Sequence, residues 1–210
     1  MTKTPSTSTS DWQVLPFCCT QDVVGRQLPK TVRVRYPNER VRLLNLMAQD
    51  QADRMSPRFF SVELRDRRAM TRRDKRRAEA VTAILDNIKT PSVRNVGIDG
   101  SRAVWLIALH NYDHKNLGRL VLIKMRRLFY KDKSQVFYPG IPYLADRLAV
   151  ARQHFSHTAR QWYGTQGWYV QHENGTHESK LFPIAHAARL VNLRRKYLLS
   201  SGGERCEHSL

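Results

Sequence analysis

Apolar residues recur at helical spacing over most of this chain. The clearest case is a set spaced i, i+3, i+7 and i+10, which lies on one face of a helix: Ala78, Val81, Leu85 and Ile88. Prolines mark several helix boundaries, because proline disfavours helical backbone in the residue before it. The same spacing predicts helices over residues 38–55, 72–89, 117–128, 143–153 and 185–199.

The segment AVWLIALH, residues 103–110, is apolar on every side. A helix of this kind is buried on all faces and forms the centre of a helical domain. Asp99-Gly100 predicts a turn before it, and Ser101 is suited to cap its first turn. A buried β-strand is the alternative for such a run, but the polar continuation through residues 111–114 favours a helix.

The ends of the chain differ in composition from its centre. TVRVRY, residues 31–36, alternates apolar and charged side chains, which predicts a short half-buried strand or an extended arm that ends at Pro37. We expect a flexible or extended arm over residues 1–37, one helical domain over 38–200 and a flexible tail over 201–210. The predicted fold is all-α, an irregular bundle of five to six helices around one buried central helix.

Several functional classes lack their sequence signatures. No run of 18 apolar residues occurs, so no membrane-spanning helix is expected, and the Thr/Ser-rich start does not resemble a secretory signal. Three cysteines without metal-ligand spacing fit a reducing cytoplasm. No phosphate-binding loop, dinucleotide glycine motif or nucleophile motif is present, so no cofactor is predicted.

The helix predicted over residues 38–55 changes character along one face. Its apolar stripe begins with Leu43 and Met47 and then runs into Asp50, Gln51 and Arg54. If the Asp50–Arg54 pair at i, i+4 were exposed, it would contribute about 0.5 kcal/mol or less to the stability of the protein. Buried, each charge needs partners that offset its desolvation. The stripe therefore predicts either a structural ion-pair network or a polar site.

Other polar residues interrupt apolar patterns later in the chain. His110 lies at the end of the buried helix, and His110 with His114 has the i, i+4 spacing of a metal chelate. No third ligand is suggested by spacing, so no metal site is predicted. Further candidates are Asp146, Arg147, Tyr163 and Gln166.

The chain is strongly basic, with 36 Lys and Arg against 18 Asp and Glu, a net charge of +18. Residues 54–77 hold ten basic and three acidic side chains, a segment that would attract polyanions. The candidates for binding a nucleic acid are Arg65, Arg68, Arg72, Arg73, Arg76 and Arg77. Basic residues also occur throughout the rest of the chain, which favours an ordinary solvated surface instead.

The motifs together resemble a bacterial family, domain-of-unknown-function family 6624, across about three quarters of the chain. The family pattern LxxMxxDQxxR is similar to the segment from Leu44 to Arg54, and GxDGxxAxWLIxxH to the segment from Gly97 to His110. YLADR and YGTQ follow in the same order. The family usually has Gln before its histidine, where this chain has Leu109. The resemblance implies an all-helical fold and a shared polar pocket, and it supplies no reaction.

These observations lead to one main hypothesis and two alternatives. We expect the eight candidates to converge on a pocket that binds or acts on a small anion: Asp50, Gln51, Arg54, His110, Asp146, Arg147, Tyr163 and Gln166. His110 would be the general acid or base, Asp50 its orienting carboxylate, and Arg54 or Arg147 the anion clamp. The alternatives are a nucleic-acid or other polyanion-binding module that uses residues 58–77, and a purely structural polar network.

Overall fold

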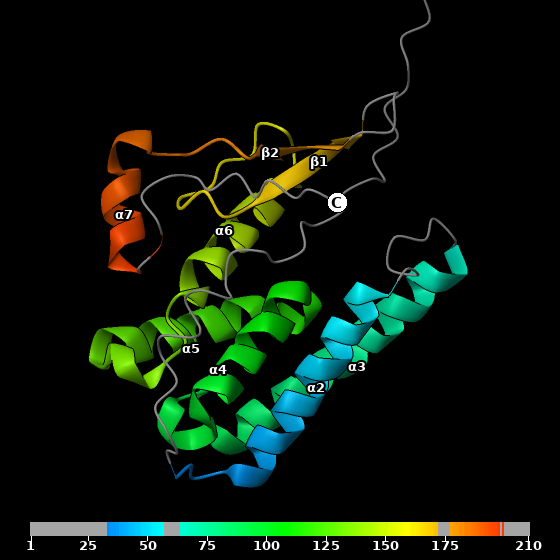
Figure 1. The fold of residues 1–210 in the computed structure, drawn as a ribbon, viewed down its shortest axis with the longest axis vertical. Helices are drawn as coiled ribbons and strands as arrows, with labels where there is room; N and C mark the ends of the chain where they lie inside the picture. The colour runs from blue at the N-terminus through cyan, green and yellow to red at the C-terminus, as the bar shows by residue number, and fades with distance from the viewer. Residues whose placement is uncertain (1–32, 57–63, 172–176, 198, 200–210) are drawn as a thin grey trace, which may run out of the picture.

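The computed structural model describes residues 33–56, 64–171, 177–197 and 199, and within them the all-α prediction is confirmed. Helices α2 and α3 run antiparallel beside α4, with α5 and α6 on its other side (Figure 1). A two-stranded hairpin and α7 follow. The main elements are α2 (Pro37–Met55), α3 (Leu64–Ile88), α4 (Val93–His110), α5 (Leu117–Lys131), α6 (Gly140–Arg152), β1 (Gly167–Gln171), β2 (His177–Leu181) and α7 (Leu190–Lys196).

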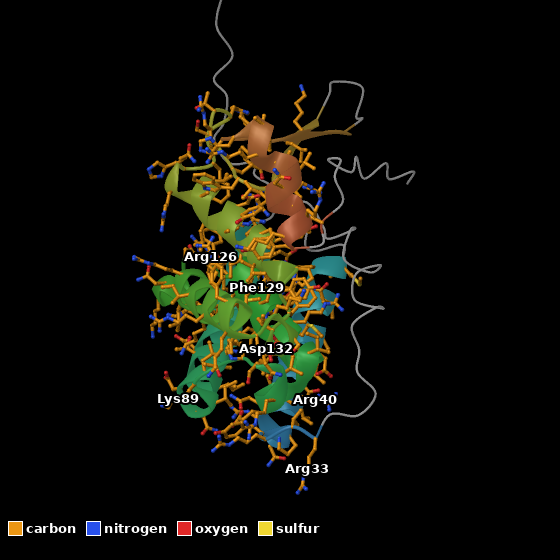
Figure 2. All side chains as sticks on the ribbon, turned by 90° about the vertical axis from the view of Figure 1, so that its left-hand side faces the viewer. Arg33, Arg40, Lys89, Arg126, Phe129 and Asp132 are labelled. Atoms are coloured by element: carbon orange, nitrogen blue, oxygen red, sulfur yellow. The ribbon has the colours of Figure 1, made fainter. Side chains whose placement is uncertain are left out.

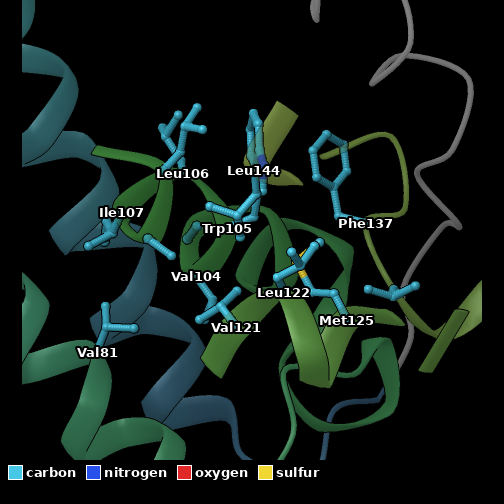
Figure 3. Packing of buried hydrophobic residues seen from close by; sticks show 14 of the residues in the cluster. Val81, Val104, Trp105, Leu106, Ile107, Val121, Leu122, Met125, Phe137 and Leu144 are labelled. Carbon is cyan, nitrogen blue, oxygen red and sulfur yellow. The ribbon is translucent and has the colours of Figure 1, made fainter. Parts of the chain in front are cut away.

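Helix α4 is the centre of the fold, as its sequence predicted. Every residue from Ala103 to Leu109 is buried, and α2, α3, α5 and α6 all pack against this helix. Trp105 is fully buried beside Phe137, with 5.1 Å between ring centroids (Figure 3). Its ring centroid also lies 6.2 Å from that of Tyr143. The β-strand alternative for this run is excluded.

The start of α4 was predicted wrongly. The helix begins at Val93 and is capped by Ser92, whose Oγ accepts a hydrogen bond from the Asn95 backbone at 3.2 Å. Gly97, at φ 76°, produces a kink where a turn was expected. Ser101 lies inside the helix, where its Oγ accepts a hydrogen bond from the Phe137 backbone.

Two other helix boundaries differ from prediction for local reasons. A helix was predicted from residue 72, but α3 already begins at Leu64, and the hydroxyl of Thr71, inside the helix, donates to the Arg67 carbonyl one turn earlier. The last helix is shorter than predicted because a 3₁₀ turn, Ala187–Arg189, precedes α7. Helix α2 ends at Met55, before Pro57, as predicted.

The N-terminal and C-terminal predictions are tested only in part. Backbone N–H groups of Arg35 and Tyr36 donate to the carbonyls of Arg94 and Asn95, so residues 33–36 lie along the start of α4 without forming a strand. The predicted arm over 1–32 and the tail over 201–210 lie outside the described residues. β1 pairs antiparallel with β2, with Gly167 opposite Leu181, and the sequence analysis predicted no strand over these residues.

Among the described residues, no helix is both long and apolar enough to cross a membrane.

Gly140, the first residue of α6, provides a test of core packing. A Cβ at this position would lie 2.7 Å from three atoms of the Trp105 ring, which is fully buried and has no room to shift. We expect Gly140→Ala to lower the free energy of unfolding by about 1–3 kcal/mol, measured by urea denaturation. Unchanged or increased stability, the result that helix propensity alone would give, would contradict this packing.

Candidate functional site

Asp50 is the most deeply buried charge of α2. Its side chain has 0% exposure at the point where α2 meets α3 and α4. Oδ2 lies 2.7 Å from His110 Nδ1 and accepts a hydrogen bond from Gln51 Nε2 at 3.0 Å. Oδ1 lies 3.3 Å from Arg54 Nη1 and 3.7 Å from Arg77 Nε. The polar end of the α2 stripe is thus buried and partnered.

Asp50 remains ionised in this environment. Burial alone would raise the pKa of Asp50, because a carboxylate loses hydration inside the protein. The hydrogen bond with His110 and the positive charge of Arg54 outweigh burial, so the pKa lies below its usual value. Asp50 therefore accepts hydrogen bonds and does not donate them near neutral pH.

A second layer of ion pairs surrounds Asp50 and joins α2 to α3. Arg77 Nη1 bonds Asp53 Oδ2 and its Nη2 bonds Asp74 Oδ1, both at 2.6 Å. Arg73 Nε bonds Asp53 at 2.9 Å, and Arg54 reaches Asp74 at 3.4 Å. The sequence analysis missed Asp53 and Asp74, although Asp74 and Arg77 are spaced i, i+3 on one helix face.

His110 presents one ring nitrogen to Asp50 and leaves the other available. Its side chain is 11% exposed, and Nε2 forms no hydrogen bond with a described residue. Burial lowers the pKa of His110, and the charges of Arg54 and Arg147 lower it further, against the opposing effect of Asp50. The imidazole is therefore neutral near pH 7. Because Asp50 is ionised, the ring proton lies on Nδ1 and the Nε2 lone pair is free.

Arg147 differs from Arg77, the buried arginine of α3, because it has no counter-charge among the described residues. Its residue is 6% exposed, and within the described chain its guanidinium makes no hydrogen bond or ion pair. The guanidinium carbon lies 5.9 Å from the Tyr112 ring centroid and 5.8 Å from that of Phe155. Burial, assisted by the charge of Arg54, lowers the pKa of Arg147 to about 10, so it is charged at neutral pH.

Two turns with left-handed backbone lie next to these aromatic residues in the chain. His154 and Phe155, just after α6, both have left-handed backbone, with φ 54° and 52°. Lys115 and Asn116, after Tyr112, are also left-handed. Such conformations are costly for residues other than glycine and are concentrated at functional sites. Neither turn was visible in the apolar pattern of the sequence.

Asp146 and its neighbours form a separate cluster. The Asp146 carboxylate accepts hydrogen bonds from the backbones of Trp162, Tyr163 and Thr165 and from the Thr165 hydroxyl. Burial raises its pKa, and these four donors oppose that shift. Asp146 thus holds the 162–165 loop in place.

Tyr163 and Gln166 also serve this loop in the structure. The Tyr163 carbonyl accepts a hydrogen bond from Arg194 at 2.7 Å, and Gln166 Nε2 donates to the Tyr143 carbonyl at 3.3 Å. No hydrogen bond or ion pair of the described residues joins this cluster to Asp50 or His110. The structure therefore places the eight candidates in two groups, one around Asp50, His110 and Arg147 and one around the loop. Adjacent helix residues such as Asp146 and Arg147 point about 100° apart.

The six arginines predicted to bind nucleic acid also divide into two groups. Arg73 and Arg77 bond to acidic residues in the layer around Asp50. The other four are exposed and make no ion pair with a described residue: Arg65, Arg68, Arg72 and Arg76. Among the described residues, no three His, Cys, Asp or Glu side chains are grouped to hold a metal ion.

The ion-pair layer predicts unequal effects for two neighbouring arginines. Arg77→Met would leave the buried Asp50 and the partly buried Asp53 short of a cation, so we expect the free energy of unfolding, measured by urea denaturation, to fall by about 3–5 kcal/mol. Arg73→Met, the matched control, removes an exposed partner of the same Asp53 and should cost less than about 1 kcal/mol. Equal costs for the two variants would contradict a buried network centred on Arg77.

The lowered pKa of His110 predicts a specific pH dependence. A histidine whose folded-state pKa lies below its unfolded value contributes full stability above pH 6.5 and loses it as pH falls toward the folded pKa. Between pH 7.5 and 5, wild type should lose more stability than His110→Asn, whose amide can still donate to Asp50. If wild type gains stability relative to the variant on acidification, His110 is instead protonated in an ion pair with Asp50.

Comparison with known proteins gives this chain no relative: no family model matches it, and no curated protein and no solved structure matches it. The resemblance to domain-of-unknown-function family 6624 stays a prediction, and the site is interpreted from its own geometry.

Proposed function

We propose that this protein binds a small anion at Arg147, beside the available nitrogen of His110. The proposal rests on Arg147, a residue 6% exposed whose guanidinium has no counter-charge in the described chain and whose buried Nε has no hydrogen-bond partner there. Folded proteins rarely bury arginine unless it is paired, because the desolvation of an unpaired charge is costly. An anionic ligand would supply the missing partner.

The surroundings of Arg147 suggest which anions it takes. The nearby rings of Tyr112 and Phe155 restrict the orientation of the guanidinium plane. A fixed planar guanidinium favours carboxylate or phosphate oxygens, which it can bind with two parallel hydrogen bonds. Arg54 adds positive charge nearby while it remains bonded to Asp50 and Asp74.

The Asp50–His110 pair supplies the chemistry of the proposed site. Asp50 fixes the tautomer in which Nδ1 carries the proton, so Nε2 can accept a hydrogen bond or a proton from the ligand. In an enzyme, His110 would be the general base, Asp50 its positioning residue and Arg147 the anion clamp. The reaction is not specified by these groups. A cytoplasmic location, suited to the three cysteines, is part of the proposal.

A purely structural network explains only part of the arrangement. Asp50, Arg54 and Arg77 have partners that join α2 to α3, and that role needs no ligand. Arg147 contributes no such bond within the described residues. Its position beside the His110–Asp50 pair therefore favours a site over a structural network.

The test compares Arg147→Met with wild type by thermal unfolding, at constant ionic strength, with inorganic phosphate and with succinate. Without anion, the variant should melt at or above wild type, because a buried unpaired charge has been removed. At a hundred times its Kd, an anion raises the free energy of unfolding by about 2.7 kcal/mol. For a chain of this size that is a rise in Tm of about 5–10 °C.

Arg119→Met is the matched control, since Arg119 is an exposed arginine of α5. This variant should keep the anion-dependent rise in Tm, and Arg147→Met should lose it. If both variants keep the rise, or if neither anion raises the Tm of wild type, the proposed site is wrong. A large loss of stability in anion-free Arg147→Met would instead assign Arg147 to the core.

A further inference from the structure

The N-terminal half of α3 contributes little to the apolar core. The buried residues of this helix begin at Arg77, so none of the preceding residues from Leu64 to Arg76 is buried. This half runs beside the last turns of α2, at the end of the helix pair that points away from α5 (Figure 1). Its side chains are therefore free of the packing constraints that fix the C-terminal half.

Four arginines of this segment share the face opposite the core. They are spaced i, i+3, i+7 and i+11, which places them along one stripe of the helix: Arg65, Arg68, Arg72 and Arg76. The core-facing residues Val81, Ile84 and Ile88 lie on the other side of the same helix. With a rise of about 1.5 Å per residue, the arginine stripe is about 16 Å long.

The arginine stripe carries uncompensated charge. None of its four members has a carboxylate partner among the described residues, whereas Arg73 and Arg77 both bond to acidic side chains. Asp66 lies about 100° around the helix from Arg65, and Asp74 is bonded to Arg77. Lys75, exposed on the same side, adds to the positive potential.

We propose that the arginine stripe binds the phosphate backbone of a nucleic acid without sequence specificity. Phosphates carry one charge per about 3.4 Å of each strand of a duplex, so a rigid row of about 16 Å can contact several phosphates of one strand. Arginine suits phosphate because its guanidinium can donate two parallel hydrogen bonds. Four exposed guanidiniums in a row along one helix face suit successive phosphates, so we expect backbone contacts to predominate.

The composition of the face favours nucleic acid over an acidic membrane. A helix that lies on a membrane buries an apolar face among the lipids. The apolar face of the C-terminal half of α3 is buried against α2 and α4, and Arg67, Thr71 and Lys75 are also exposed in the first half. In the described part of this end of the helix pair, the exposed large apolar side chains are Leu64 and Met55, which do not make a continuous apolar face.

Other basic residues are dispersed and provide a matched control. Arg33, Lys89 and Arg126 are well separated over the molecule in Figure 2. Arg119 and Arg127 of α5 and Lys133 just after it are exposed and make no ion pair with a described residue. Reversal of three charges, whether in the arginine stripe or at these three control positions, lowers the net charge of the chain from +18 to +12.

The test is fluorescence anisotropy of the full chain with a labelled 20-base-pair duplex DNA in 50–300 mM KCl. Wild type should bind with an affinity that falls steeply with salt, with a slope of about −0.9 for each phosphate contact. The triple variant Arg68→Glu, Arg72→Glu, Arg76→Glu should lose at least ten-fold in affinity at 50 mM KCl. Its salt slope should be smaller by about 3.

The control variant Arg119→Glu, Arg127→Glu, Lys133→Glu should change affinity less than three-fold. Equal losses in the two triple variants would show that net charge alone attracts DNA and would overturn the proposal. Absence of binding by wild type at 50 mM KCl would also overturn it, as would binding to phosphatidylserine vesicles with none to DNA. Arg147→Met should leave DNA binding unchanged, so this test is independent of the proposed anion site.

Discussion

The buried carboxylate of Asp50 is the interaction on which the arrangement of the first three described helices depends. A charge with no solvent exposure must be surrounded by donors and cations, and α2, α3 and α4 each supply one or more. Arg77 then brings Asp53 and Asp74 together, so the ion pairs fix how α3 lies along α2. The apolar core around Trp105 supplies hydrophobic stabilisation, and the ion-pair layer sets how α3 is positioned along α2.

Neutralisation of charge distinguishes the structural arginines from the functional candidates. Arg40, Arg54, Arg73 and Arg77 each bond to a carboxylate and join helices. Arg147 is buried without one, and the arginine stripe of α3 is exposed without one. These two sets of unpaired arginines suit different ligands. A buried unpaired cation suits one small anion, whereas a row of exposed cations suits an extended polyanion.

The sequence was sufficient to predict the helical class and the central position of α4. A helix that is apolar on every side is stable only when it is buried on every side. The sequence also located the junction of Asp50, Gln51, Arg54 and His110, since polar residues on a core-facing stripe must meet partners. It could not separate Asp146 from Arg147, because their partners depend on the course of a loop after α6. Tyr112 and Phe155 were missed for a related reason, as left-handed turns at non-glycine residues leave no periodic pattern. The hairpin was missed because its strands pair only with each other.

We propose that Asp50 holds a neutral His110, with its Nε2 lone pair available, near an uncompensated Arg147. The most direct measurement is a long-range ¹H–¹⁵N correlation spectrum of the histidine rings at pH 7, with the His110 signals assigned by their loss in His110→Asn. We expect a protonated Nδ1 and an unprotonated Nε2 in His110. A protonated Nε2, in either an imidazolium or the opposite tautomer, would contradict this assignment, because His110 would then offer no free base to a ligand.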